Sequence, residues 1–301
     1  MRSLVAFIRL GRPLFLGGGF LMFGLGAAIA AWHGHAIELR LYALGQLAVT
    51  AFQLMTHYAN DYYDFDADRA NTTPTRWSGG SRVLTNGELP RRVALTAALV
   101  LAGLGLATSL ALVTTTDVPA SALPTLLAMF TLAWVYSAPP LRLCARGAGE
   151  LDTALVVTVL VPWLGFSLHA PDLRGVDTLL LAIVPPALLQ FAMLLAIEFP
   201  DAAGDAATGK HTLVVRLGAA RAARLYVMLT LAAFAWLPIA VLLGLPLAVA
   251  VAGASPFPVA LWRIIRIADH RDRDAFERLT FFAVFLLVAT AACELAAFIL
   301  R

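Results

Sequence analysis

The chain has 301 residues, of which 60% are hydrophobic and only 14% are charged, and its mean hydropathy is +0.80. A water-soluble protein of this length carries roughly a quarter of its residues as charged side chains, so the composition excludes a soluble fold and predicts a protein embedded in a lipid bilayer. The net charge is +3 at pH 7. The sequence contains no run of basic residues along which a nucleic acid backbone could bind, so we expect no nucleic acid partner.

Apolar stretches of about 17 to 25 residues indicate membrane-spanning helices. The chain contains nine of them, at residues 14–32, 39–59, 93–113, 118–137, 151–168, 177–197, 222–243, 244–265 and 279–300. The eighth follows a tight turn and contains three prolines, so a count of eight is the alternative. We therefore expect residues 1–301 to form one domain, an all-α polytopic membrane protein with nine transmembrane helices.

The basic residues are distributed unevenly between the two ends of these helices. Nineteen of the 22 lysines and arginines lie in the N-terminal segment and in the loops after the second, fourth, sixth and eighth spans. The other side has only Arg40, Arg174 and Arg301. Because cytoplasmic loops carry the excess of basic residues, we expect a multi-pass protein of the cell inner membrane with its N-terminus and long polar loops in the cytoplasm.

A dense cluster of oxygen donors follows the second span, where residues 60–68 read NDYYDFDAD. If the helix continues, Asn60, Asp64 and Asp68 share one face at i, i+4 and i+8, with Asp61 beside them. Like charges at this spacing repel unless a cation neutralises them. Oxygen ligands without histidine or cysteine favour Mg²⁺, Mn²⁺ or Ca²⁺ over zinc.

The alternative for this cluster is a solvated acidic helix end without a ligand. The same face, however, continues into the membrane through Gln46, Gln53 and His57. A plain exposed helix end does not need a polar stripe beneath it, so we favour a metal site.

A second acidic cluster follows the sixth span, where residues 198–218 read EFPDAAGDAATGKHTLVVRLG. Asp201 and Asp205 are again at i and i+4, with Glu198 one turn earlier and Gln190 two turns before that. Mg²⁺ is commonly held by one or two carboxylates together with substrate phosphate oxygens. Two acidic clusters on one face of the membrane therefore predict a diphosphate bound between them through metal ions.

Several side chains are candidates for binding the anion itself. Lys210 is the single lysine among the 22 basic residues and follows Asp205 closely, although an ordinary basic loop residue is the alternative. The other candidates, which positive-inside topology or an interfacial aromatic belt explains equally well, are Arg12, Arg82, Tyr136, Arg142, Arg146 and Arg216.

Glu294 places a carboxylate inside the last span. Ionisable groups at such positions are functional candidates by default. The alternative is that Glu294 reaches water at the headgroups, because it lies near the non-cytoplasmic end.

The two clusters resemble the signature of the UbiA superfamily of intramembrane prenyltransferases. NDYYDFDAD has that family's NDxxDxxxD pattern, and DAAGD at residues 201–205 has its DxxxD pattern. GKHTLVVRLG at residues 209–218 is similar to a segment of the branch that prenylates 1,4-dihydroxy-2-naphthoate for menaquinone synthesis, although that branch commonly has asparagine at the position of Glu198.

The resemblance implies a helical bundle around a central cavity, in which Mg²⁺ held by both motifs binds a prenyl diphosphate and the prenyl group passes to an aromatic acceptor. It implies catalytic roles for Asp61, Asp64 and Asp201. The metal ligands would be Asn60, Asp64, Asp68, Asp201 and Asp205. Asn60 and the anion-binding candidates would contact the substrate.

Two rival functions stay open on the sequence alone. An intramembrane terpene cyclase, or a transferase to a non-aromatic acceptor, would use the same motifs. An ion-coupled transporter would place polar groups near the midplane of several spans, whereas the ionisable residues here gather at one face.

Overall fold

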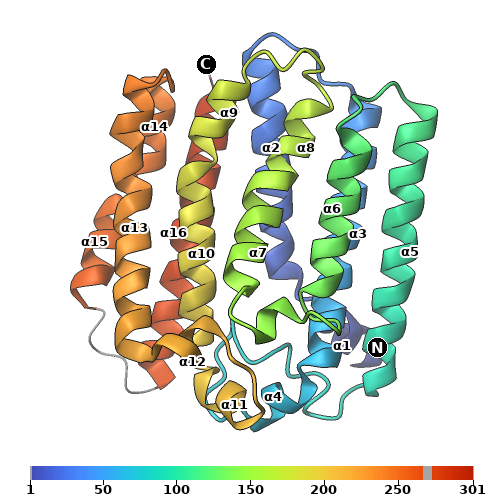
Figure 1. The fold of residues 1–301 in the computed structure, drawn as a ribbon, viewed down its shortest axis with the longest axis vertical. Coiled ribbons are helices and arrows are strands. Elements are labelled where there is room, and N and C mark those ends of the chain that lie inside the picture. Colours follow the sequence, from blue (N-terminus) through green and yellow to red (C-terminus); the bar gives the residue numbers. More distant parts are fainter. Residues whose placement is uncertain (1, 267–272, 301) are drawn as a thin grey trace.

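The computed structural model describes residues 2–266 and 273–300, and within these ranges the regular secondary structure is entirely helical. Long helices run side by side along one axis, and a layer of short helices and loops covers one end of them (Figure 1). The prediction of an all-α polytopic membrane protein is confirmed.

Seven helical stretches in the described ranges are long and apolar enough to cross a membrane. They are Ser3–Trp32, Arg91–Thr115, Gly149–Ser167, Val176–Glu198, Ala219–Leu242, Leu247–Ile265 and Asp274–Ile299. Two further predicted spans coincide with α3 (Leu39–Tyr63), which has 25 residues but carries polar groups, and with α6 (Ala122–Val135), which has 14. Seven of the nine predicted spans thus satisfy both criteria.

Four of these stretches are interrupted. Residues 3–32 comprise α1 (Arg2–Leu10), the 3-10 turn η1 (Pro13–Phe15) and α2 (Leu16–Trp32), and the chain bends where Arg12 adopts a left-handed conformation with φ of 48°. Residues 149–167 comprise α7 (Gly149–Leu155), the π-helical turn η3 (Val156–Leu160) and α8 (Val161–Ser167). The helix pairs α9 (Val176–Ala182) with α10 (Val184–Glu198) and α14 (Leu247–Ala254) with α15 (Phe257–Ile265) break next to prolines, which lack the N–H that a continuous helix needs.

The remaining long helices are α5 (Arg91–Thr115), α13 (Ala219–Leu242) and α16 (Arg273–Ile299). The cap consists of α4 (Phe65–Ala70), α11 (Ala202–Ala207), α12 (Leu213–Leu217) and the loop of residues 71–90. The cap lies at the same end as the N-terminus, and the C-terminus lies at the opposite end (Figure 1). Two parts of the predicted charge pattern, Arg271 and Arg301, lie outside the described residues.

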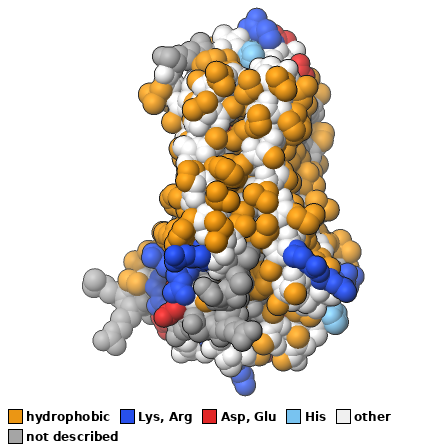
Figure 2. All heavy atoms as spheres, turned by 90° about the vertical axis from the view of Figure 1, so that its left-hand side faces the viewer, with side chains coloured by type: hydrophobic (Ala, Val, Ile, Leu, Met, Phe, Trp, Pro, Cys, Tyr) orange, Lys and Arg blue, Asp and Glu red, His pale blue; other side chains and the backbone are white. Residues whose placement is uncertain are grey.

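Hydrophobic side chains cover the middle of the face formed by α13 to α16, and basic side chains lie at both edges of this apolar belt (Figure 2). Inside the bundle, glycines let two helices approach closely. A Cβ atom on Gly26 of α2 would lie 2.0 Å from the Pro162 carbonyl oxygen, and one on Gly165 of α8 would lie 2.3 Å from the Phe23 carbonyl oxygen. The hydrophobic effect does not drive helices together in lipid, so close van der Waals packing through small residues stabilises a crossing of this kind.

Glu294 of α16 is fully buried, with 0% of its surface exposed. It packs across Gly253 of α14, and neither of its carboxyl oxygens has a hydrogen-bond partner within the described part of the chain. The alternative in which Glu294 reaches headgroup water is therefore wrong, because the neighbouring helices cover it completely.

Candidate functional site

A cavity of about 240 Å³ lies between the cap and the helical bundle. At the cap end its wall is polar and includes both acidic motifs and Lys210. Toward the middle of the bundle the wall is mainly apolar, formed by Phe15, Val49, Phe52, Met129, Val156, Val157, Met193, Leu194, Val284 and Leu287. Leu14 and Val288 line the cavity and are also 58% and 38% exposed on the outer surface, so the chamber reaches the lipid-facing side.

The first motif lies where α3 ends. The helix does not continue without a break through the motif, because α3 ends at Tyr63 and α4 begins at Phe65. The backbone N–H of Asp64 still donates to the Asn60 carbonyl at 2.8 Å, and that of Asp68 donates to the Asp64 carbonyl at 2.9 Å. These two bonds have helical spacing, so all three predicted metal ligands of this motif line the cavity in one row.

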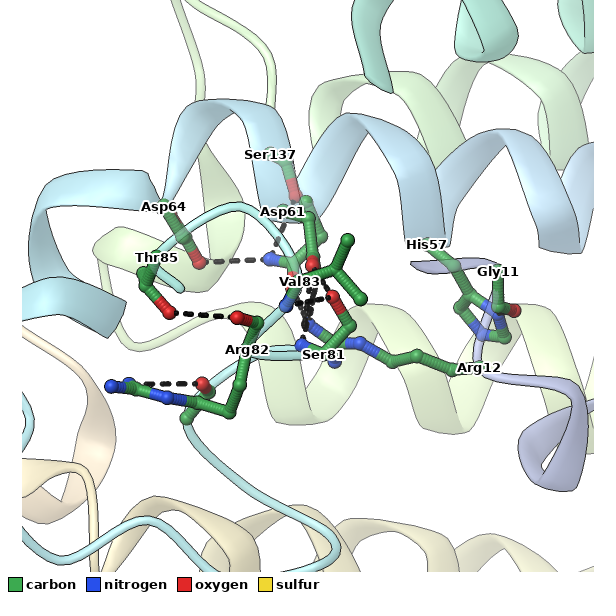
Figure 3. Close-up of polar contacts among 12 residues, drawn as sticks. Gly11, Arg12, His57, Asp61, Asp64, Ser81, Arg82, Val83, Thr85 and Ser137 are labelled. Atoms are coloured by element: carbon green, nitrogen blue, oxygen red, sulfur yellow. Dashed lines mark hydrogen bonds and ion pairs between the residues drawn. The ribbon is translucent and has the colours of Figure 1, made fainter. Parts of the chain in front are cut away.

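Asp61 has a different environment from the rest of its motif. Its carboxylate accepts hydrogen bonds from the Arg12 guanidinium and from the Ser81 hydroxyl and backbone N–H, as drawn in Figure 3. It is 3% exposed and does not line the cavity. Asp61 therefore holds Arg12, which does line the cavity, and fastens the loop of residues 71–90.

The second motif holds the other half of that loop. Asp201 accepts hydrogen bonds from the Asn71 side-chain amide at 2.6 Å and from the Gly79 backbone N–H at 3.0 Å. The Thr73 hydroxyl donates to the Pro200 carbonyl at 2.7 Å. The loop is thus a lid that is bonded to both acidic motifs and closes the polar end of the cavity.

Lys210 joins the two motifs. Its ammonium group lies 3.0 Å from an oxygen of Asp64 and 3.1 Å from an oxygen of Asp205. Burial disfavours the charged lysine, but the charges of Asp64 and Asp205 outweigh burial and raise the pKa of Lys210 well above its usual value. Two acidic segments that are remote in the sequence therefore face a common point, which a cation already occupies.

The acidic side chains of the two motifs are more numerous than the basic side chains that pair with them. Burial and then the charge of Asp205 raise the pKa of Asp201 to about 7. Burial and then the charge of Asp61 raise the pKa of Asp68 well above its usual value, and burial also raises that of Asp205. An arrangement of this kind favours the binding of further positive charge.

The predicted arginines fall into two groups. Arg12 lines the cavity and donates to Asn60 at 3.2 Å, and Arg142 reaches Asp64 at 3.5 Å without lining the cavity. The others bind backbone carbonyl oxygens: Arg82 that of Asp68, Arg146 that of Pro140, and Arg216 that of His211. Tyr136 lines the cavity. The substrate-binding roles of all these residues stay predictions.

Three contributors to the site were missed by the sequence analysis. Asn71 and Gly79 hold Asp201, and no motif marks such loop contacts. Asp152 of α7 lines the cavity and is only 6% exposed. It is a carboxylate within a predicted span, and this alone could have identified it as a candidate.

The geometry can be compared with known proteins. The family pattern described as "UbiA prenyltransferase family" matches residues 20–288. The structure is similar to a digeranylgeranylglyceryl phosphate synthase structure, with a TM-score of 0.67, 16% identity and complete coverage of both chains. It is also similar to a UbiA homologue from Archaeoglobus fulgidus bound to DMAPP and Mg²⁺, with a TM-score of 0.64, 20% identity and coverage of 95% of this chain and 98% of that one.

A UbiA homologue from Aeropyrum pernix K1 in its apo form gives a TM-score of 0.66 at 19% identity, with coverage of 93% of this chain and 97% of that one. Comparison with curated protein sequences gives no match. The structural likenesses establish the fold, and the family pattern spans most of the sequence. The chain belongs to the UbiA prenyltransferase family.

Proposed function

We propose that the protein catalyses the Mg²⁺-dependent transfer of a prenyl group from a prenyl diphosphate to an aromatic acceptor within the membrane. The observation that carries the proposal is the meeting of both acidic motifs at Lys210 directly above an apolar chamber. A prenyl diphosphate has a charged head and a hydrocarbon chain. The polar end of the cavity suits the charged head, and the apolar end suits the hydrocarbon chain. The opening of the cavity to the lipid-facing surface accommodates a longer chain.

The donor set fits Mg²⁺. Asn60, Asp64, Asp68, Asp201 and Asp205 line the cavity and offer only oxygen atoms. Within the described ranges, no three histidine, cysteine or acidic side chains are close enough to hold a metal ion by themselves. This agrees with a cation that keeps water molecules and takes further ligands from substrate phosphates. Bound there, Mg²⁺ would neutralise charge on the leaving diphosphate.

The protein's own groups supply the remaining requirements of the reaction. Lys210 and Arg12 place positive charge beside the leaving diphosphate, where it counts most because the site is screened from water. The carbon–oxygen bond then breaks with its electron pair on the diphosphate. The lid and the apolar walls keep water from the allylic cation until the acceptor ring attacks.

For the acceptor, we propose 1,4-dihydroxy-2-naphthoate, which would place the protein in menaquinone biosynthesis. The similarity of residues 209–218 to that branch supports this choice. The excess of basic residues in the N-terminal segment and the cap loops supports a cytoplasmic location for the cap in a cell inner membrane.

The test is an assay of the purified protein in lipid nanodiscs with labelled prenyl diphosphates of several chain lengths and a panel of hydroxylated aromatic acceptors. We expect a prenylated acceptor that forms with Mg²⁺ and not with EDTA. Mg²⁺-independent turnover would contradict the mechanism. A cyclic hydrocarbon formed without acceptor would indicate a terpene cyclase, and solute uptake by proteoliposomes without any product would indicate a transporter.

A further inference from the structure

Asp152 is an acidic side chain of the cavity wall that belongs to neither motif. It lies on α7, it is 6% exposed, and its Oδ1 atom is buried without a hydrogen-bond partner in the described part of the chain. A buried carboxyl oxygen without a partner costs free energy. A ligand in the cavity that donates a hydrogen bond would remove that cost.

Two other buried carboxylates, one on α7 and one at the end of α10, already have a structural task. Glu150 accepts a hydrogen bond from the backbone N–H of Leu213 at 3.2 Å, and Glu198 accepts one from Val214 at 3.3 Å. Both bonds hold the first turn of α12. Asp152 makes no such bond through Oδ1, and no lysine or arginine in the described ranges forms an ion pair with it.

The position of Asp152 along α7 sets its depth in the cavity. At the start of the helix, a Cβ atom on Gly149 would lie 3.2 Å from the Tyr136 ring, and Cys144 lies 3.8 Å from Asp64. Asp152 is three residues further on, about 4.5 Å deeper at 1.5 Å per residue. The apolar wall of Val156 and Val157 begins one turn beyond it.

This level is where the bond to be broken must lie. In a prenyl diphosphate, the reacting carbon is the first atom on the hydrocarbon side of the head. With the head between the two motifs, that carbon and the attacking atom of the acceptor lie at the boundary between the polar and apolar walls. Asp152 is the acidic side chain at that boundary that carries an unpaired buried oxygen.

We propose that Asp152 binds a hydroxyl group of the acceptor and takes its proton as the ring attacks, an inference that rests on the proposed function. The carbon–oxygen bond of the prenyl diphosphate breaks with its electron pair on the diphosphate, and a ring carbon forms a bond to the freed allylic carbon. The O–H electron pair becomes a ring carbonyl while the proton passes to Asp152. The attacked carbon then loses its proton to the released diphosphate, or loses CO₂ where it carries a carboxylate, and Asp152 returns the hydroxyl proton to the oxygen.

The experiment compares two reactions of the same protein in nanodiscs with Mg²⁺. One is the slow hydrolysis of the prenyl diphosphate without acceptor, and the other is transfer to a hydroxylated acceptor. For Asp152→Asn, we expect hydrolysis within twofold of wild type and a fall in kcat/KM for the acceptor of about 100-fold or more, the usual size of a general-base effect. Asp152→Glu, which keeps the carboxylate, should restore part of the transfer, and Asp177→Asn, at an exposed position of α9, is the control.

A second measurement does not depend on the folding of any variant. The wild-type protein should transfer the prenyl group to an acceptor whose hydroxyl groups are methylated about 100-fold more slowly than to the parent acceptor, since no proton is available to Asp152.

Equal rates with both acceptors, unchanged transfer in Asp152→Asn, or an equal loss of hydrolysis and transfer in that variant would each overturn the inference. If the wild type hydrolyses prenyl diphosphates but prenylates no acceptor, the proposed function fails, and this inference fails with it.

Discussion

The two acidic motifs face the same cavity but hold their carboxylates in different ways. In the first motif, Asp61 binds Arg12, and Asp64 lies within contact distance of both Lys210 and Arg142. In the second motif, Asp201 is held by neutral donors, the amide of Asn71 and the backbone N–H of Gly79. Burial and then the charge of Asp205 raise the pKa of Asp201 to about 7, although the Gly79 N–H acts in the opposite direction. Asp61 and Asp64 thus pair with cations of the protein, and Asp205 shares Lys210 with Asp64, whereas Asp201 has only neutral donors and depends more on added cations.

The largest effect should come from Asp64, the residue through which the first motif contacts Lys210. We expect Asp64→Ala to lower kcat by about 1,000-fold or more, as expected for the loss of a group that stabilises charge at a reacting centre. Asp66→Ala is the matched control, because Asp66 belongs to the same motif but is exposed. Similar activity of both variants would remove the distinction between lining and non-lining carboxylates.

The next largest effect should come from the lysine that both motifs share. Lys210→Met should lower kcat by about 100-fold, because one donor to the developing charge is lost. The metal-free variant should unfold at a lower temperature than the metal-free wild type, because Asp64 and Asp205 lose their common cation. Addition of Mg²⁺ should raise the unfolding temperature of the variant more than that of the wild type. Arg221→Met, at an exposed position of α13, should change neither quantity.

The pH dependence of Mg²⁺ binding should reflect the protonation of Asp201 in the second motif. With a pKa of about 7, Asp201 is mostly protonated at pH 6 and mostly ionised at pH 8. Metal binding must displace that proton, so the apparent affinity for Mg²⁺ should rise by about tenfold over this interval. Titration of turnover against Mg²⁺ at several pH values measures it. If the apparent Mg²⁺ affinity of an Asp201→Asn variant changed with pH as much as that of the wild type, the assignment of the proton to Asp201 would be contradicted.

The smallest effects should come from the lid, and they should differ between its two attachments. Ser81→Ala weakens a bond to the charged Asp61, whereas Thr73→Val removes a bond to the neutral Pro200 carbonyl. Bonds to charged groups contribute about twice as much, so Ser81→Ala should raise the KM for prenyl diphosphate by about tenfold and Thr73→Val by about threefold. Limited proteolysis within residues 71–90 should accelerate in the same order. Thr85→Val is the control, because the Thr85 hydroxyl bonds only to Arg82 within the lid.

Much of the fold could be predicted from hydropathy, and the exceptions have physical causes. The α3 helix falls below the apolar criterion because it contains polar residues such as Gln46, Gln53 and His57, which lie inside the bundle. The break at Arg12 depends on a left-handed backbone conformation that an arginine rarely adopts. Apolar composition shows that a segment enters the bilayer, but it does not show where the helix bends.

The part of the site that the sequence predicts is the one in which oxygen-donor side chains recur at helical spacing. Asn60, Asp64 and Asp68 keep their common row even though the helix is interrupted, because i to i−4 bonds persist on both sides. The use of Asp61 to hold Arg12, and the contact of Lys210 with both motifs, depend on tertiary approach between distant segments. Spacing along one chain carries no information about such approach.

The π-helical turn η3 makes the span of residues 149–167 respond to a change of length according to where the change occurs. A π turn contains one residue more than an α turn, so deleting one residue between Val156 and Val161 would leave an α turn and keep the faces of α7 and α8 aligned. Deleting one of residues 153–155 instead would turn the start of α7 by about 100° relative to α8, which the close contact of Gly165 with α2 keeps in place. Asp152 would then leave the cavity wall although both aspartate motifs stay intact.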